Sequence, residues 1–291
     1  MRYRGSGRLA QALDRTYHAQ GLLMALIPPA FLNCVVCIGV AAPGGTNWIG
    51  TGFLIGRPSG EGDNQYFTKL VTNRHVLEGK SEVVVRFNSD DNAKVLDYPV
   101  QLFSGSKQIW AGHPAPEVDI AVLPINPDIL KRDHAEFAFY ELDKHAMKVA
   151  DLREEGVSEA DGIFVLGFPL GIVSADRKHV IARSGIIARI RDVLDGKERC
   201  YLIDANIFPG NSGGPVILRP EVTAIQDTKS IGRSALIGMV KSYVPYRDVA
   251  VSQQTGNPRV IFEENSGLAL VESVDSILEA VEASHTAERA V

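Results

Sequence analysis

From about residue 31 to residue 272, short apolar runs rich in β-branched residues alternate with stretches of Gly, Pro, Asn and Asp. Regularly spaced runs of this kind predict strands and favour a β-barrel or a β-sandwich, and the pattern alone does not distinguish the two. A first block of expected strands is 34–40, 48–56, 66–72, 82–87 and 120–123, and a second block is 162–167, 179–191, 200–205, 215–218 and 235–241.

The pattern changes at three other places. Residues 126–158 are rich in charge and include Pro127, which predicts a connection between the two blocks with room for a short helix. Near the C-terminus the apolar spacing becomes that of a helix, with Ser273 as its expected N-cap and a buried face of Val274, Ile277, Leu278 and Val281. An N-terminal helix is predicted to begin near Ser6, with an apolar stripe of Leu9, Leu13 and Tyr17.

Composition limits the class of protein. Of the 291 residues, 45% are hydrophobic and 22% are charged, and the net charge of −5 argues against nucleic-acid binding. The seven histidines are scattered and form no metal-binding motif, so we expect neither a metal nor a cofactor. Cys34 and Cys37 are expected to point to opposite sides of a strand and therefore not to bridge, and Cys200 is expected to be a core residue.

An apolar segment at residues 21–27 follows several arginines and superficially resembles a signal sequence. Polar residues interrupt the approach to it, Pro28 and Pro29 end it, and it is much shorter than the ~20 residues that cross a membrane. We therefore expect no membrane span and a cytoplasmic protein, with a periplasmic or membrane-associated location through this segment as the alternative.

The stretch Gly210-Asn211-Ser212-Gly213-Gly214-Pro215 has the composition of a nucleophile site. The glycines leave the serine hydroxyl uncrowded and allow backbone N–H groups to converge on one point, as attack on a carbonyl requires. By itself, such a stretch is also compatible with an ordinary glycine turn that contains a serine.

A base and an acid occur at suitable places elsewhere in the chain. His75 follows the end of an apolar strand, and Asp119 precedes the β-branched run 120–123. In this interpretation His75 accepts the proton of the Ser212 hydroxyl, and Asp119 holds the imidazole in the required tautomer. Taken singly, the histidine could be an ordinary surface or core residue, and the aspartate an ordinary cap of a strand.

Together these motifs resemble those of the chymotrypsin-like (trypsin-fold) serine proteases, and more closely those of the bacterial HtrA-like peptidases. The resemblance rests on T-N-R-H-V at 72–76, D-I-A-V-L at 119–123 and G-N-S-G-G-P at 210–215, in that order. Weaker matches extend it over roughly residues 33–283. In contrast to multi-domain HtrA proteins, we expect no PDZ domain within residues 1–291.

The resemblance implies an all-β fold of two antiparallel six-stranded β-barrels, with helices at both ends and the C-terminal helix lying across the second barrel. The corresponding parts are an N-terminal helical extension at 1–30, the first barrel at 31–125, the connection between the barrels at 126–158, the second barrel at 159–272, and the C-terminal helix and tail at 273–291.

For function, the resemblance implies a serine endopeptidase that acts on protein or peptide substrates, with an oxyanion hole formed by the N–H groups of Gly210 and Ser212. The implied pocket for the substrate side chain includes Asn206, Phe208, Val240 and Ser242. Because Asn206 is not acidic, we expect a neutral or small side chain there. Secreted relatives have an aspartate at the position of Asn211 that pairs with a newly cut N-terminus, so we expect no such activation step here.

Two alternatives remain open. A catalytically silent binding module could retain the protease fold and all three residues. The sequence around Ser212 also satisfies G-x-S-x-G, the nucleophile elbow of α/β-hydrolases, but the only histidine after it is His285 in the polar C-terminal tail, and strands and helices do not alternate.

Overall fold

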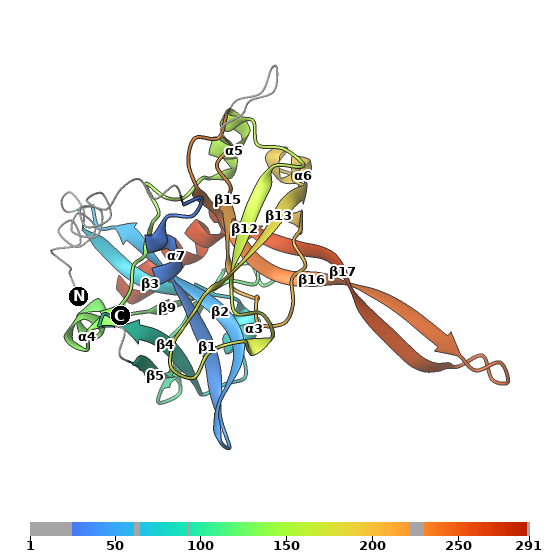
Figure 1. Cartoon of the computed structure of the whole chain (residues 1–291), viewed down its shortest axis with the longest axis horizontal. Coiled ribbons are helices and arrows are strands. Elements are labelled where there is room, and N and C mark those ends of the chain that lie inside the picture. The colour runs from blue at the N-terminus through green and yellow to red at the C-terminus, as the bar shows by residue number, and fades with distance from the viewer. Residues whose placement is uncertain (1–24, 61–64, 92–93, 222–229, 290–291) are drawn as a thin grey trace.

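The computed structural model describes residues 25–60, 65–91, 94–221 and 230–289. The first part of this described chain is a mixed sheet whose central strands are long and apolar, and the second part is a closed antiparallel barrel (Figure 1). The predicted N-terminal helix falls in residues 1–24 and lies outside the described residues. The first described helix is the single turn α2 (Pro29–Asn33).

The first sheet has nine strands in the order β10-β4-β1-β2-β3-β9-β8, with β11 paired to β2 and β5 paired to β4. Its members are β1 (Val35–Ala42), β2 (Gly45–Pro58), β3 (Tyr66–Thr72), β4 (Glu82–Ser89), β5 (Val95–Gln101), β8 (Ala111–Gly112), β9 (Ala121–Pro124), β10 (Ala135–Glu136) and β11 (Tyr140–Glu141). The single-turn helix α3 (Arg74–Leu77) follows β3, and α4 (Pro127–Arg132) and α5 (Val149–Glu155) lie in the predicted connection.

This sheet corrects the expectation of a first six-stranded barrel. Among the described residues no ladder joins the edge strands β5 and β8. The segment between them forms a separate small ribbon of β6 (Phe103–Ser104) and β7 (Lys107–Gln108), and β8 is itself only two residues long. An edge this short offers too few backbone groups to close a ring.

The second sheet confirms the expected closed barrel, with the strand order β12-β13-β14-β17-β16-β15. Its strands are β12 (Gly162–Gly167), β13 (Ile181–Arg189), β14 (Cys200–Asp204), β15 (Pro215–Leu218), β16 (Ala235–Val251) and β17 (Pro258–Ser273). The short helix η1 (Pro169–Gly171) follows β12, and α6 (Arg191–Leu194) follows β13. The predicted spans of β12 and β15 match the observed ones, whereas β16 continues ten residues past its predicted end at 241.

The C-terminal helix α7 (Val274–Arg289) is confirmed, and Ser273 caps it by accepting a hydrogen bond of 3.4 Å from the Ser276 N–H. The helix does not lie over the barrel alone, because it also contacts β8 and β9 of the first sheet. Its apolar face joins residues of both sheets in one buried cluster, represented by Phe53, Val118, Leu166 and Ile277. The two sheets and α7 therefore share a common core.

Two further expectations concern cysteines and membrane helices. All three cysteines are free, as predicted; Cys34 and Cys37 are buried, whereas Cys200, expected in the core, is half-buried. No helix among the described residues has the length and apolar character needed to cross a membrane.

The ends of β16 and β17 leave the barrel as a long two-stranded arm, residues 245–265, which projects from the molecule (Figure 1). The arm exposes six large apolar side chains, each at least 44% accessible: Tyr246, Val249, Val251, Val260, Ile261 and Phe262. Because successive residues of a strand point to opposite faces, the apolar run 260–262 makes both faces of the arm apolar. None of the three buried apolar clusters of the described chain includes a residue of the arm.

Lysine 178 is a buried charge that ties the barrel to the first sheet. It is 4% exposed, its Nζ donates to the Val35 carbonyl at 2.5 Å, and its backbone is paired with the Asn88 side chain. Burial lowers the pKa of Lys178 from 10.5 to about 8, outweighing the attraction of Glu136. Folding therefore releases a proton from this side chain at mildly alkaline pH.

We predict that Lys178 makes stability increase with pH. In the unfolded chain the lysine keeps its proton up to pH 10.5, whereas in the folded chain it loses it near pH 8. The cost of the buried charge, roughly 3 kcal/mol, is fully present below pH 8 and disappears by pH 10.5. Urea unfolding of the parent and of Lys178→Met between pH 7 and 10.5 measures this, since only the parent should show the corresponding slope. Parallel pH dependences in the two proteins would contradict it.

We also predict that the arm is dispensable for folding. Tyr246 pairs directly with Glu264, so replacing residues 247–263 by Asn-Gly closes a two-residue hairpin at that pair. Because the replaced residues lie outside the buried clusters, the melting temperature should stay within a few degrees, and solubility should rise as exposed apolar surface is removed. Loss of a cooperative thermal transition would show that the arm contributes to the core.

Candidate active site

His75 and Asp119 are brought together by the pairing of β3 with β9. In this ladder Thr72, the last residue of β3, lies opposite Ala121, the first residue of β9. The strands are antiparallel, so the residues just after β3 meet the residues just before β9. This pairing places the imidazole on α3 and the carboxylate two residues before β9, at the same end of the two strands.

The contact between the two side chains is formed. His75 Nδ1 lies 2.6 Å from Asp119 Oδ2, and the His75 backbone N–H donates to Oδ1 at 3.1 Å. Because a carboxylate only accepts, the proton lies on Nδ1 and Nε2 is left as the acceptor. The histidine side chain is 50% exposed and that of Asp119 is 19% exposed, so the imidazole faces solvent while the carboxylate stands behind it.

Ser212 lies in the loop between β14 and β15 of the barrel. Backbone hydrogen bonds give this loop its shape: the N–H groups of Asn211, Gly213 and Gly214 donate to Phe208, Val240 and Asn211, respectively. The tight path requires glycine at Gly213, where φ is +82° and an added Cβ would lie 2.1 Å from the Thr51 carbonyl oxygen. The strand β15, and not a helix, directly follows the serine, so the α/β-hydrolase elbow is the wrong interpretation.

Thr51 of β2 fastens the serine loop to the first sheet. Its N–H donates to the Ser212 carbonyl at 2.9 Å, and its hydroxyl donates to the Gly210 carbonyl at 2.6 Å. The same hydroxyl accepts from the Phe168 N–H at 3.1 Å, and the Thr51 carbonyl accepts from the Thr72 hydroxyl at 2.7 Å. Thr51 is fully buried, so water does not compete for these bonds.

The serine loop and the histidine turn are therefore neighbours. An added Cβ on Gly213 would lie 2.4 Å from Thr72 Oγ1 and 3.2 Å from the Asn73 nitrogen, two residues before His75. Gly50 lies between Val76 and the Ser212 carbonyl. A Cβ added to Gly50 would lie 2.9 Å from a Val76 methyl carbon and 3.5 Å from the Ser212 carbonyl oxygen. The described hydrogen bonds include none between the Ser212 hydroxyl and His75, and such bonds are commonly long without substrate.

Two backbone N–H groups of this loop, those of Gly210 and Ser212, have no acceptor among the described hydrogen bonds. The Pro209 carbonyl accepts from the Leu170 N–H at 2.6 Å, which turns the Gly210 N–H of the same trans peptide to the opposite side. Gly210 has φ of +95°, and a Cβ there would lie 2.3 Å from the Phe168 carbonyl oxygen, so this conformation requires glycine.

The residues expected for the substrate pocket lie around the same loop. The Phe208 and Val240 carbonyls accept hydrogen bonds from it, Ser242 follows on β16, and Asn206 is exposed with φ of +47°. The guanidinium of Arg183 lies 5.2 Å from the centre of the Phe208 ring. No group of three or more potential metal ligands occurs among the described residues.

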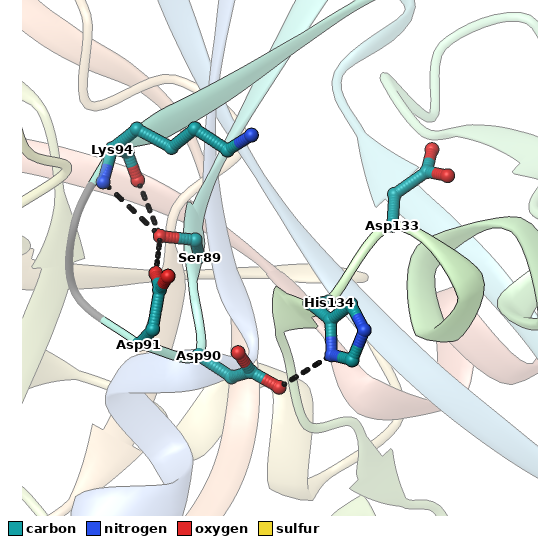
Figure 2. A pocket seen from close by; sticks show the side chains of 6 residues that line it. All are labelled: Ser89, Asp90, Asp91, Lys94, Asp133 and His134. Carbon is teal, nitrogen blue, oxygen red and sulfur yellow. Dashed lines mark hydrogen bonds and ion pairs between the residues drawn. The ribbon is translucent and has the colours of Figure 1, made fainter.

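A polar depression of about 350 Å³ lies elsewhere on the first sheet (Figure 2). It contains a serine, a histidine and aspartates, yet it lacks a free nucleophile. The Ser89 hydroxyl donates to Asp91 at 2.5 Å and accepts from the Lys94 N–H, whereas His134 pairs with Asp90 at 3.2 Å. The depression therefore holds two separate polar pairs, each satisfied locally.

Sequence reasoning missed the residues that hold this site in place. Thr51 lies in the expected strand 48–56, Lys241 ends the expected strand 235–241, and Glu272 ends the expected second barrel, but the sequence assigns none of them a role. Glu272 is fully buried at the end of the apolar run 268–271, and a lone charge in such a strand is a signal that could have identified it.

Comparison with known proteins gives a family match. The model of the trypsin-like peptidase domain matches residues 50–221, which includes His75, Asp119 and Ser212. HhoA of Synechocystis sp., named as a candidate serine protease, is 28% identical over 200 residues. That alignment covers 66% of this chain and 41% of HhoA, so the chain spans less than half the length of this relative.

Solved structures of similar shape include three proteases. The HtrA-type protease AlgW with a decapeptide has a TM-score of 0.47 at 20% identity, covering 88% of this chain and 66% of AlgW. The MamO protease domain from Magnetospirillum magneticum has a TM-score of 0.44 at 12% identity, and the match covers 86% of this chain and 96% of MamO's. The inactive Ser343Ala mutant of Rv3671c from M. tuberculosis has a TM-score of 0.41 at 16% identity, and the match covers 89% of this chain and 94% of Rv3671c's. Family membership rests on the domain match.

We predict that the Thr51 hydroxyl supports both stability and the shape of the serine loop. Thr51→Val leaves the Gly210 carbonyl and the Phe168 N–H buried without a partner, which should cost about 1–3 kcal/mol of unfolding free energy. Chemical denaturation measures the loss, and Thr51→Ser, which keeps the hydroxyl, is the matched control. Equal stabilities of the valine and serine variants would contradict the assignment.

Proposed function

Because the chain belongs to the trypsin-like peptidase family, we propose that it is a serine endopeptidase that cleaves peptide bonds through an acyl-enzyme on Ser212. The observation that carries the proposal is the formed His75–Asp119 pair, with 2.6 Å between Nδ1 and Oδ2, beside the glycine-rich loop that carries the half-buried Ser212. The substrates are proteins or peptides, and no metal or cofactor takes part in this scheme.

The proposed reaction has two halves, acylation of Ser212 and hydrolysis of the acyl-enzyme, and His75 transfers protons in both. Ser212 Oγ attacks the peptide carbonyl while its proton passes to His75 Nε2, and the new C–O bond produces a tetrahedral oxyanion. His75 then donates that proton to the departing amine nitrogen as the C–N bond breaks. Water, deprotonated by His75 Nε2, attacks the ester carbonyl, and the ester C–O bond then breaks as Ser212 Oγ takes the proton back from His75.

Asp119 and the backbone N–H groups have supporting roles in the proposal. The Asp119 carboxylate keeps the proton on His75 Nδ1 and stabilises the imidazolium that forms. The N–H groups of Gly210 and Ser212, which lack acceptors among the described residues, would bind the oxyanion. The bond between Pro209 and Leu170 supports this role because it orients the Gly210 N–H before substrate arrives.

The proposed specificity pocket favours uncharged side chains. Asn206, Phe208, Val240 and Ser242 supply no carboxylate to pair with a basic residue. The Arg183 guanidinium over the Phe208 ring adds positive charge nearby and would disfavour lysine or arginine. We also propose that no cut N-terminus is needed to form the site. Asn211 is fully buried, and its side-chain oxygen accepts from the Phe208 N–H at 3.3 Å, so it supports the loop as a neutral group.

We predict that Ser212→Ala abolishes peptide hydrolysis and leaves the melting temperature within a few degrees of the parent. Asp119→Asn should lower kcat by roughly 10⁴-fold, by analogy with other proteases that use these three residues, because the amide favours the wrong imidazole tautomer. Hydrolysis of a denatured protein substrate and labelling by a fluorophosphonate probe measure both effects.

The probe also separates an enzyme from a silent binding module. Labelling of the parent at Ser212, identified by mass spectrometry and absent in Ser212→Ala, supports the peptidase. A parent that neither labels nor cleaves while remaining folded would favour the binding module. Full activity of Ser212→Ala would remove the serine from the mechanism.

A further inference from the structure

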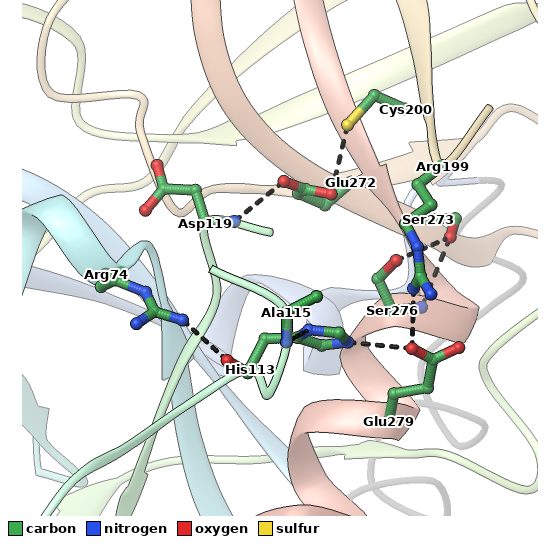
Figure 3. Close-up of polar contacts among 10 residues, drawn as sticks. All are labelled: Arg74, His113, Ala115, Asp119, Arg199, Cys200, Glu272, Ser273, Ser276 and Glu279. Atoms are coloured by element: carbon green, nitrogen blue, oxygen red, sulfur yellow. Dashed lines mark hydrogen bonds and ion pairs between the residues drawn. The ribbon is translucent and has the colours of Figure 1, made fainter. Parts of the chain in front are cut away.

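A buried carboxylate lies directly behind Asp119 (Figure 3). Glu272 of β17 is fully buried, and its Oε1 accepts a hydrogen bond of 3.0 Å from the Asp119 backbone N–H. The same oxygen lies 2.9 Å from Lys241 Nζ, and Oε2 accepts from the Cys200 thiol at 3.2 Å. Three donors thus satisfy a charge that would be very costly to bury alone.

The strand pairing of the barrel assembles this group. Cys200 of β14 lies directly opposite Glu272 of β17. On the other side, the register between β16 and β17 shifts between Val240 and Ser242, which leaves Lys241 at a bulge. Bulges re-aim side chains, and here the lysine reaches Glu272 and the loop that carries Asp119.

Lys241 holds a second point of the same loop. Its Nζ donates to the Glu117 carbonyl at 2.8 Å, and its side chain is 24% exposed. Burial lowers the pKa of Lys241, but the hydrogen bond and attraction to Glu272 outweigh burial, so the pKa is raised and the ammonium stays charged. Burial and the neighbouring Glu272 raise the pKa of Cys200 to about 12, so the thiol remains a donor.

We propose that Glu272 and Lys241 are positioning residues for the reaction assigned above, an inference that rests on the proposed function. Lys241 fastens the Glu117 carbonyl and Glu272 fastens the Asp119 N–H, two residues apart. The barrel thereby fixes the backbone of residues 117–119, and the Asp119 carboxylate stays aligned with His75. Lys241 acts through the Glu117 carbonyl and Glu272 through the Asp119 N–H, so both hold backbone groups and are not catalytic residues.

The pair also balances charge beside the imidazole. Titratable side chains on the elements around the His75–Asp119 pair are Arg74 on α3, His113 and Glu117 on the loop before β9, Cys200 on β14, Lys241 on β16, Glu272 on β17 and Glu279 on α7. Glu272 and Lys241 are opposite charges in contact, so removing one leaves the other uncompensated. A lone Glu272 favours protonated His75, and a lone Lys241 disfavours it.

The test is a titration of His75 by NMR in four proteins: the parent, Lys241→Met, Glu272→Gln and the double variant. We expect the midpoint to move up by about half a pH unit or more in Lys241→Met and down by a similar amount in Glu272→Gln. In the double variant it should return close to the parent value. A merely structural role would not produce opposite shifts that cancel.

Kinetics test the alignment itself. Glu272→Leu removes the acceptor of the Asp119 N–H, and kcat should fall about 100-fold with KM within twofold, as expected for a small misplacement of a catalytic group. Glu272→Gln keeps an acceptor oxygen and should remain within about tenfold of the parent. Leu152→Ala, which removes buried contacts on α5, controls for lost stability and should keep the parental kcat.

Unchanged His75 midpoints in both single charge variants would overturn the proposal, as would a Glu272→Leu enzyme with parental kcat. If Glu272→Leu does not fold, the titration of the two charge variants decides. A parent that fails to hydrolyse peptides or to label with the probe would instead refute the proposed function. The titration remains informative in that case, because it requires only the folded His75–Asp119 pair.

Discussion

The proposed chemistry depends on one buried junction between the two sheets, the contact of Thr51 with the serine loop. A threonine on the first sheet uses its N–H and its hydroxyl to hold the Ser212 and Gly210 carbonyls, and its own carbonyl is held by Thr72. Because Thr72 ends the strand that leads to the histidine turn, these bonds relate the nucleophile loop directly to His75. The serine loop cannot shift against the histidine without breaking buried hydrogen bonds, each of which is costly to leave unmade.

The acid is held by the converse arrangement. Asp119 belongs to the first sheet through β9, yet its N–H is bonded to Glu272 of the barrel. The loop before Asp119 also bonds to two other elements. The buried His113 of this loop has its Nε2 2.9 Å from Glu279 of α7, and the Glu117 carbonyl accepts a hydrogen bond from Lys241 of β16. The first sheet thus holds the serine loop of the barrel, and the barrel holds the Asp119 backbone of the first sheet. Misdocking of the two sheets would therefore disturb the nucleophile and the acid together, because contacts between the sheets hold both.

Local sequence patterns predicted the elements that depend on residues close together in the chain. The strands of the barrel were found because buried runs of β-branched residues end at turn formers, and the C-terminal helix because its apolar spacing changes. Whether the first sheet closes was not predictable from sequence, because closure would require the two-residue β8 to pair with a distant edge, and no such ladder forms among the described residues. The arm was missed because its residues lie outside the core, where burial leaves no periodic signal beyond the expected strand end at residue 241. Ser212, His75 and Asp119 each stand in a motif, whereas Thr51 and Glu272 acquire their roles only through contacts far along the chain.

An ion pair behind the acid needs a physical reason, because well-packed apolar residues at such a place are often as stable. Directed bonding provides that reason, since the N–H of Asp119 needs an acceptor and the carbonyl of Glu117 needs a donor, and apolar side chains supply neither. A carboxylate alone would meet the first need but add negative charge beside Asp119, and an ammonium alone would oppose the imidazolium. Placed together, Glu272 and Lys241 satisfy both backbone groups and leave the net charge beside the His75–Asp119 pair unchanged.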